Sequence, residues 1–453
     1  MRRIPSLLFI TLFLGGFARA QQSPEGETHR FNLQQCLDYA IENQDSVKNA
    51  RLDIKKAEYK VKETIGLGLP QVSGVASIQD YLKVPTSLLP GEFFGQPAGT
   101  FIPVRFGVKY QGSTAVNVSQ LIFDGSYLVG LKASKTYKEL SQRNFTRSRI
   151  NTKATVTKAY YQVLVSGEQL KLLDANEKQL KQQLTETTAQ NKQGFVEKID
   201  VDRLSVQYNN LVTNRENTIR SLALNYQLLK FQMGMPVNDN LVILEKIEDI
   251  KLDTAAAAQS AAGRDTSAYR KRIEFGLTET QIKLNELNLQ RIKSQYLPTL
   301  SANGQAAYAF QANSLNKLVD QRFPTVFIGA QLNVPIFNGF QRLNQVRQAK
   351  IEVEKARNGQ NMLKNGIQVE IDQAHINYQN GLKSLNSQNE NMTLAKEVLR
   401  VSRIKYQQGV GSSIEVTQAQ TDLDTSINNY INALYDVLVS KVDLDKATGT
   451  INE

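Results

Sequence analysis

The residues that could do chemistry are few and widely separated in this 453-residue chain. His29 and His375 are the only histidines, and Cys36 is the only cysteine. A histidine-based catalytic triad or a zinc site needs such residues close together, so we expect no enzymatic activity, no metal site and no cofactor. The five methionines do not cluster, which disfavours a copper-specific role. The Gly-x-Gly at residues 66–68 precedes Pro70 and indicates a helix end rather than a phosphate-binding loop.

The first 20 residues have the pattern of a secretory signal peptide. Residues 1–3 are charged, residues 7–17 are apolar, and residues 18–20 supply small side chains at the expected cleavage point after Ala20. The apolar stretch is about half of the ~20 residues that a membrane-spanning helix needs. Cys36 lies too far from this stretch to carry a lipid, so we expect an exported protein without a lipid anchor. Because Cys36 is the only cysteine, we expect no internal disulfide.

The net charge of +11 includes three arginines of the expected signal peptide, Arg2, Arg3 and Arg19. The remaining lysines and arginines alternate with acids along helical stretches, as in residues 55–58. Nucleic-acid binding would need the positive charge gathered in one patch, so we expect no nucleic-acid partner.

The two halves of the chain repeat the same motifs in the same order. Leu-Pro at residues 69–70 recurs at 297–298, and the Phe-x-Gly that ends at Gly125 recurs at Gly339. Gly194, with Ile-Asp-Val at residues 199–201, recurs as Gly409, with Ile-Glu-Val at residues 414–416. We therefore predict an internal two-fold repeat. Its units are residues 31–250 and 267–449, joined by an equatorial linker at residues 251–266.

Each half is expected to contain a helix, two strands and two long helices. The strands are predicted at about 70–82, 110–123, 299–311 and 325–337, and the long helices at 126–192, 199–232, 340–407 and 414–447. Apolar and polar side chains alternate from Val326 to Ile336. This length suits a strand that crosses a bilayer at a tilt, although the alternation alone also fits a soluble sheet.

The length of the third long helix separates these two interpretations. Residues 340–407 contain no proline, and such a helix would reach on the order of 100 Å, which is too long for a globular domain. Its apolar or small side chains between Ile367 and Tyr406 are spaced alternately four and three residues apart, which predicts coiled-coil packing. Four strands are too few to close a membrane barrel, which needs about eight or more, so we expect an oligomer.

These motifs resemble those of the outer-membrane efflux protein (TolC) family, from about Phe31 to Gly449. The similarity includes the opening helix from Asn32 to Ala40, followed by Asn43. It also includes the helix-to-strand transitions at Pro70 and Pro298 and the strand-to-helix transitions at Gly125 and Gly339. Proline cannot extend a helix, and glycine permits the tight return into the next one.

The resemblance implies a mainly α fold with a small transmembrane β part. In a homotrimer, four strands per chain would form a 12-stranded β-barrel that continues into a long α-helical coiled-coil barrel. The protein would lie in the cell outer membrane, contact its lipid, and extend a large part into the periplasm. It would export small molecules or proteins together with a periplasmic adaptor and an inner-membrane pump. The loops at 84–108 and 312–324 would face outside the cell.

The alternative is a structural coiled-coil protein that spans the envelope without transport activity. It accounts for the long helices but not for the repeated strand pairs.

Residues 405–420 resemble the helix-turn-helix at the periplasmic tip of the family. By residue match, Glu415 takes the main acidic pore position, Asp200 its counterpart, and Tyr406 the place of a tyrosine that holds the closed state. The tip turns would be made by Gly194, Gly409 and Gly411. Three copies of Glu415 would form a ring that favours cations.

The tip also departs from the family pattern. Gln418 stands where a second acid is usual, and Gly411 stands where a basic residue is usual. An acid such as Glu415 in the first turn of a helix also stabilises the helix by about 0.3–1 kcal/mol without any pore. Both interpretations of Glu415 remain open from the residues alone.

Overall fold

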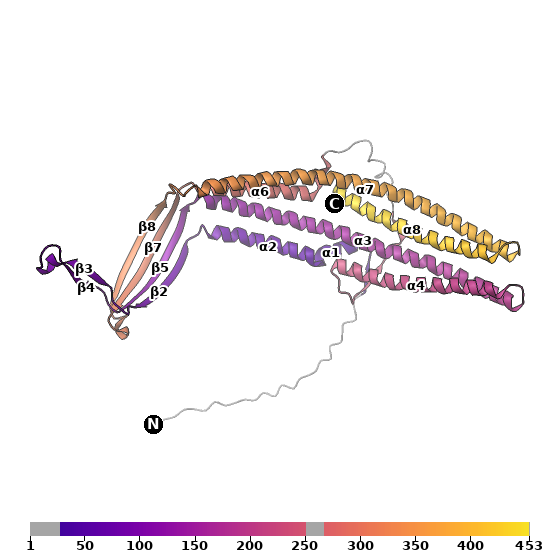
Figure 1. Cartoon of the computed structure of the whole chain (residues 1–453), viewed down its shortest axis with the longest axis horizontal. Coiled ribbons are helices and arrows are strands. Elements are labelled where there is room, and N and C mark those ends of the chain that lie inside the picture. The colour runs from indigo at the N-terminus through magenta and orange to yellow at the C-terminus, as the bar shows by residue number, and fades with distance from the viewer. Residues whose placement is uncertain (1–27, 251–266, 453) are drawn as a thin grey trace, which may run out of the picture.

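The computed structural model describes residues 28–250 and 267–452. The expected signal peptide at 1–20 and the expected linker at 251–266 lie outside the described residues. Figure 1 shows an elongated chain with a small β-sheet at one end and long helices that run away from it toward two hairpin turns at the other end. None of the described helices is long and apolar enough to span a membrane.

The main sheet has four antiparallel strands in the order β2-β5-β7-β8. They are β2 (Gln71–Asp80), β5 (Tyr110–Phe123), β7 (Thr299–Ala312) and β8 (Arg322–Asn333). The prediction that the last strand extends to residue 337 was wrong, because β8 ends at Asn333. Pro335 has no N–H group to donate to a neighbouring strand, which is one reason why the ladder cannot continue.

The two faces of this sheet differ in polarity. Val116, Ala306 and Val326 lie opposite one another on neighbouring strands and therefore share one face, which is apolar. The other face carries polar pairs. The Ser77 and Ser113 hydroxyls lie 2.8 Å apart, and the Gln305 amide donates to Asn117 Oδ1 at 2.8 Å. The sheet is therefore apolar on one side and hydrogen-bonded by polar side chains on the other.

Seven α-helices are described. They are α1 (Leu33–Asn43), α2 (Asp45–Gly66), α3 (Gly125–Lys192), α4 (Lys198–Met233), α6 (Ile273–Ser294), α7 (Gln341–Gln407) and α8 (Ser413–Thr448). The opening helix, predicted as one element, is divided at Gln44. Its backbone is extended there, and its side chain caps α2 by accepting from the N–H groups of Ser46 and Val47.

The helices form one layer whose neighbours change along its length. Near the sheet the packing order is α2-α3-α6-α7, and toward the hairpin turns it is α4-α3-α8-α7 (Figure 1). One edge of the molecule therefore consists of β2, α2 and α4, and the other consists of β8 and α7. Within the described residues neither edge has a further neighbour, except at the hairpin turns, where Tyr406 of α7 contacts Asp200 of α4.

Two apolar cores hold the long helices together. On α7, Ile367, Tyr378 and Leu399 are at most 2% exposed, and they belong to one apolar cluster with Leu423, Val437 and Leu444 of α8. These positions belong to the four-and-three spacing that predicted coiled-coil packing. On the other pair of long helices, α3 contributes Leu173 and Leu180 and α4 contributes Leu204 and Leu211. Each long helix pair thus has its own continuous apolar contact.

A third core lies at the middle of the molecule, where β1 (Thr28–Phe31) pairs in parallel with β6 (Asn240–Ile243). Cys36, Tyr160 and Met233 are fully buried there. Burial raises the pKa of Cys36 to about 12, so its thiol stays protonated and unreactive at physiological pH.

The loop at residues 84–108 contains a β-hairpin that the sequence did not predict. It consists of β3 (Thr86–Pro90) and β4 (Phe101–Arg105), and it projects beyond the end of the main sheet (Figure 1). The loop between β7 and β8 contains the short 3-10 helix η5 (Leu315–Lys317).

Candidate functional site

The two turns that end the long helices lie together at the end of the molecule farthest from the sheet (Figure 1). Gly194 and Gly409 have φ angles of +79° and +75° and supply the left-handed residue that ends α3 and α7. Gly411 has a different role. A Cβ at Gly411 would lie 3.0 Å from Lys405 Cβ and 3.1 Å from the Tyr406 nitrogen, so a side chain there would crowd the last turn of α7.

Tyr406 and Asp200 are brought together from α7 and α4. The Tyr406 hydroxyl donates to Asp200 Oδ2 at 3.2 Å, and Arg203 lies 3.6 Å from the same carboxylate. Burial and the negative charge of Asp200 raise the pKa of Tyr406 to about 12. The tyrosine therefore stays protonated, and it can donate this hydrogen bond over the whole physiological pH range.

Glu415 is placed apart from this pair. It lies in the first turn of α8, where its N–H donates to the Ser412 hydroxyl at 3.3 Å, and its side chain is exposed. Within the described part of the chain it forms no ion pair. An exposed carboxylate at this position can line a passage only if other copies of the chain complete one.

A buried polar cluster lies further along the same helices, and the sequence analysis missed it. Asn176 of α3 donates to Asp424 Oδ1 of α8 at 2.6 Å, and Gln420 of α8 donates to Asn176 Oδ1 at 3.1 Å and to Asp424 at 3.0 Å. Arg403 of α7 donates to Gln420 Oε1 at 2.9 Å. Three helices are therefore tied together by one hydrogen-bonded group.

Burial dominates the electrostatics of this cluster. Gln420 is 1% exposed and Asn176 is 5% exposed. Removal from water raises the pKa of Asp424, although Gln420, Asn176 and Arg403 act in the opposite direction. Burial also lowers the pKa of Arg403. The sequence did contain a signal, because Gln420 occupies an apolar position in the register of Val416 and Leu423, where a polar residue needs a partner.

The predicted transition residues lie where helices and strands join. Pro70 stands between α2 and β2, and Pro298 stands directly before β7. Gly339 has a φ of +62° and is followed by Phe340 at +63°. Gly125 does not need a positive φ, because a Cβ there would instead lie 2.9 Å from Leu297 Cδ1. Its role is close packing between the two halves of the chain.

The sequence matches the family described as "Outer membrane efflux protein" over residues 36–220 and 281–450. The chain belongs to this outer membrane efflux protein family. The matched residues include both hairpin turns, the Tyr406–Asp200 pair and the buried polar cluster.

Two curated outer membrane proteins illustrate the similarity. Outer membrane protein TolC of Vibrio cholerae is 20% identical over 342 residues, which cover 75% of this chain and 77% of the relative. The probable efflux pump outer membrane protein TtgC of Pseudomonas putida is 22% identical over 447 residues, covering 95% and 86%.

The fold is shared with solved structures of channels. The structure of the Campylobacter jejuni CmeC outer membrane channel superposes with a TM-score of 0.73 at 17% identity, covering 92% of this chain and 85% of that one. In this efflux protein, the described residues contain no group of three or more His, Cys, Asp or Glu side chains that could hold a metal ion.

Proposed function

We propose that this efflux protein is one protomer of a trimeric outer-membrane channel through which solutes leave the periplasm. The proposal rests on one observation: the sheet and the helical layer of the described chain form a segment of a wall with two edges. Its two edges are β2, α2 and α4 on one side and β8 and α7 on the other. Other copies of the same chain can close these edges into a continuous wall.

The sheet edges make closure necessary in a membrane. The outer strands β2 and β8 each have one side without a β-partner in the described chain. An unpaired strand edge costs several kcal/mol for each bare backbone group in hydrocarbon, so such an edge cannot face lipid. Three copies would supply twelve strands, which exceeds the minimum of about eight for a closed membrane barrel.

The edge helices carry apolar stripes that suit the same closure. On α7, Met362, Val369 and Ile376 follow one another at seven-residue spacing and are 75%, 67% and 51% exposed. On α4, Leu224 and Phe231 have the same spacing and are 54% and 67% exposed. Exposed apolar positions at heptad spacing are typical of helix-to-helix contacts. We propose that α4 of one copy packs against α7 of the next.

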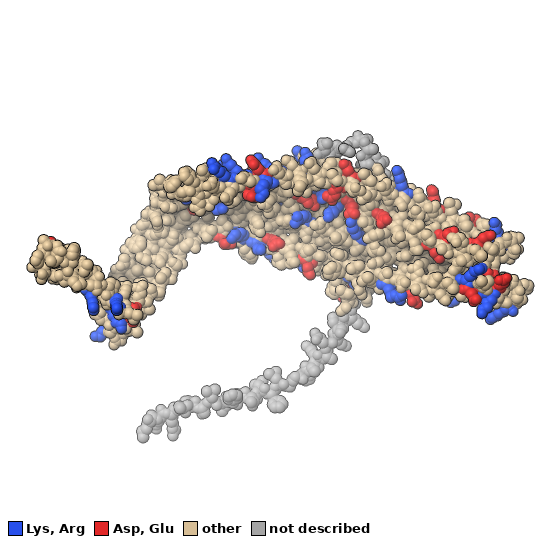
Figure 2. Space-filling view, viewed as in Figure 1, with Lys and Arg blue, Asp and Glu red and all other residues tan. Residues whose placement is uncertain are grey.

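The distribution of charge supports a membrane position for the sheet. Figure 2 shows a belt without Lys, Arg, Asp or Glu between the outer end of the sheet and the first charged side chains of the helices. In the sequence, β5 and β7 have no charged residue, while β2 and β8 have one each, Asp80 and Arg322, at the outer end. The apolar face with Ile328, which is 89% exposed, would contact lipid, and the polar face would line the lumen.

The helical tip would act as the gate. The Tyr406–Asp200 hydrogen bond joins α7 to α4 and would hold the tip closed. Exposed Glu415 from three copies would form an acidic ring that favours cations. A periplasmic adaptor would displace the tip helices, an inner-membrane pump would supply the energy, and solutes would then pass by diffusion.

The assembly can be tested on the purified protein in detergent. We expect the wild-type mass to equal three copies, and we expect the trimer to dissociate on heating. The double variant Val369→Asp/Ile376→Asp places like charges in the proposed interface and should lower the fraction of trimer at least several-fold. Asn377→Asp, on an exposed position of α7 away from the stripe, is the matched control and should remain trimeric. Unchanged association of the double variant would contradict the proposed contact between α4 and α7.

The cargo class is open between small molecules and proteins. Curated relatives include a toluene efflux pump outer membrane protein of Pseudomonas putida and a proteases secretion protein of Dickeya chrysanthemi. A deletion strain should become more susceptible to toxic compounds if the cargo is small molecules, and it should lose secreted proteins if the cargo is protein. Neither change would favour the structural alternative without transport.

A further inference from the structure

The outer end of the sheet carries positive charges that the chain itself does not neutralise. Lys83 and Arg105 lie at the base of the β3–β4 hairpin, Lys317 lies in η5, and Arg322 begins β8. None of these four forms an ion pair within residues 28–250 and 267–452. Nearby, Lys109 lies 4.0 Å from Asp80. Figure 2 shows Lys and Arg side chains gathered where the hairpin leaves the sheet.

The acids of the same loops do not compensate for these cations. Glu92 lies within the projecting hairpin and Asp320 lies between η5 and β8, and neither forms an ion pair in the described chain. The outer end therefore keeps an excess of free cationic groups, which attract anionic ligands.

Arg322 lies on the apolar face of the sheet. It is opposite Phe310 of β7, which is opposite Gly112 of β5, so the side chains of this row share one face. The loop after β7 returns to the same face, because Leu318 is only 7% exposed and its Cδ2 would lie 3.6 Å from a Cβ at Gly112. This contact brings Lys317, the residue before Leu318, to the outer end of the apolar face.

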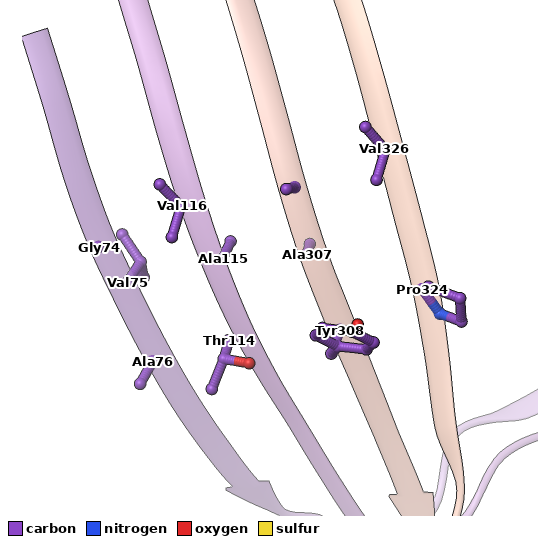
Figure 3. A pocket seen from close by; sticks show the side chains of 11 residues that line it. Gly74, Val75, Ala76, Thr114, Ala115, Val116, Ala307, Tyr308, Pro324 and Val326 are labelled. Carbon is purple, nitrogen blue, oxygen red and sulfur yellow. The ribbon is translucent and has the colours of Figure 1, made fainter.

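A hollow of about 490 Å³ opens on the apolar face below these cations. Figure 3 shows the side chains that line it, which come from all four strands. Small residues make the depression and larger apolar residues surround it; they include Gly74, Ala76, Val116, Ala306, Tyr308 and Val326. Val326 is four residues from Arg322 on β8, which corresponds to about 13 Å along a strand. The hollow and the cations are thus arranged in line along the strand direction.

We propose that this surface binds a phosphorylated, acylated lipid of the outer leaflet. An acyl chain would lie over the hollow, and a phosphate of the headgroup would contact Arg322 and Lys317. Guanidinium groups suit phosphate because they donate two parallel hydrogen bonds, and Tyr308 suits the boundary between hydrocarbon and headgroup. This inference rests on the proposed position of the sheet in the outer membrane.

The test uses the full-length protein in mild detergent and a fluorescent lipid A that carries both phosphates. The double variant Lys317→Gln/Arg322→Gln should bind it about 10-fold more weakly than wild type, or weaker still, because two cations near the headgroup are lost. The control Lys293→Gln/Arg342→Gln removes the same charge next to the opposite end of the sheet and should bind within about two-fold of wild type. Dephosphorylated lipid A should bind weakly to all three proteins.

Three results would overturn the proposal. They are equal binding of phosphorylated lipid A by wild type and the double variant, equal binding of the phosphorylated and dephosphorylated lipids, and full displacement by millimolar inorganic phosphate. The last would mean that the site takes free phosphate. The same preparations are tested for conductance in planar bilayers. A conducting wild type that fails the lipid test removes this inference alone, whereas a folded wild type that never conducts removes the proposed channel function.

Discussion

At the scale of single residues, the hydrogen bonds of the buried cluster around Gln420 are the most important contacts next to the hairpin turns. Gln420→Ala would leave Arg403 without its acceptor and would remove the hydrogen bonds that Gln420 donates to Asn176 of α3 and to Asp424 of α8. Buried polar groups that lose a partner cost about 1–3 kcal/mol each. We predict that backbone amides of α8 near residue 420 exchange with deuterium at least about 10-fold faster in this variant.

Gln418→Ala is the matched control for this prediction. Gln418 is exposed and donates only to Asp422, at 2.9 Å, so its loss should leave exchange almost unchanged. Equal effects of the two variants would show that the cluster does not hold the helices together.

The sequence indicated only part of this residue-scale picture. Tyr406 and Asp200 were predicted from the resemblance to the family, and the turn glycines Gly194 and Gly409 from the repeated motif, because a turn constrains the residues next to it. Asn176 of α3, which accepts a hydrogen bond from Gln420, lies 244 residues from it in the chain, and Arg403 comes from α7. A single sequence does not say which long helices lie side by side, so this cluster could not be assembled from it.

At the scale of elements, the turn after α7 can be tested with two glycine substitutions that should change the stability of the protein in opposite directions. Gly409 has a φ of +75°, and an alanine there costs roughly 1–2 kcal/mol because its Cβ crowds the backbone. Gly359 lies in the middle of α7 with no other atom near its Cβ position, and alanine there should stabilise the helix by about 0.5–1 kcal/mol. Thermal unfolding of the purified protein should therefore shift down for Gly409→Ala and up for Gly359→Ala. A higher midpoint for Gly409→Ala would contradict the assigned turn.

The long helices could be predicted from the sequence because their pattern is continuous over many turns. The β3–β4 hairpin could not, since four prolines between residues 84 and 108 make a regular strand improbable by local rules. The break at Gln44 was missed for a different reason. Gly234, after α4, lies so close to Asn43 and Gln44 that a Cβ there would be 2.7 Å from their backbone atoms, so distant packing fixes the position of that break.

At the scale of the whole molecule, the single chain has the shape of one segment of a wall and does not close into a complete wall. The open edges of the sheet and of the helical layer lie on corresponding sides, so one rotation between copies would close both. The strand count predicted an oligomer from the sequence alone. Which helices form the edges required the structure, because edge and interior helices have similar apolar patterns until their neighbours are known.

Conductance in a planar bilayer tests the central claim most directly. Wild-type protein should give a small, cation-preferring conductance, and Tyr406→Phe, which removes the donor to Asp200, should raise it several-fold. The raised pKa of Tyr406, about 12, means that the protonated hydroxyl and its contribution are fully present below about pH 10 and are lost as pH rises through about 12. This contact should therefore cause no change in conductance between about pH 6 and 9. A folded wild type and Tyr406→Phe variant that both fail to conduct would contradict the account.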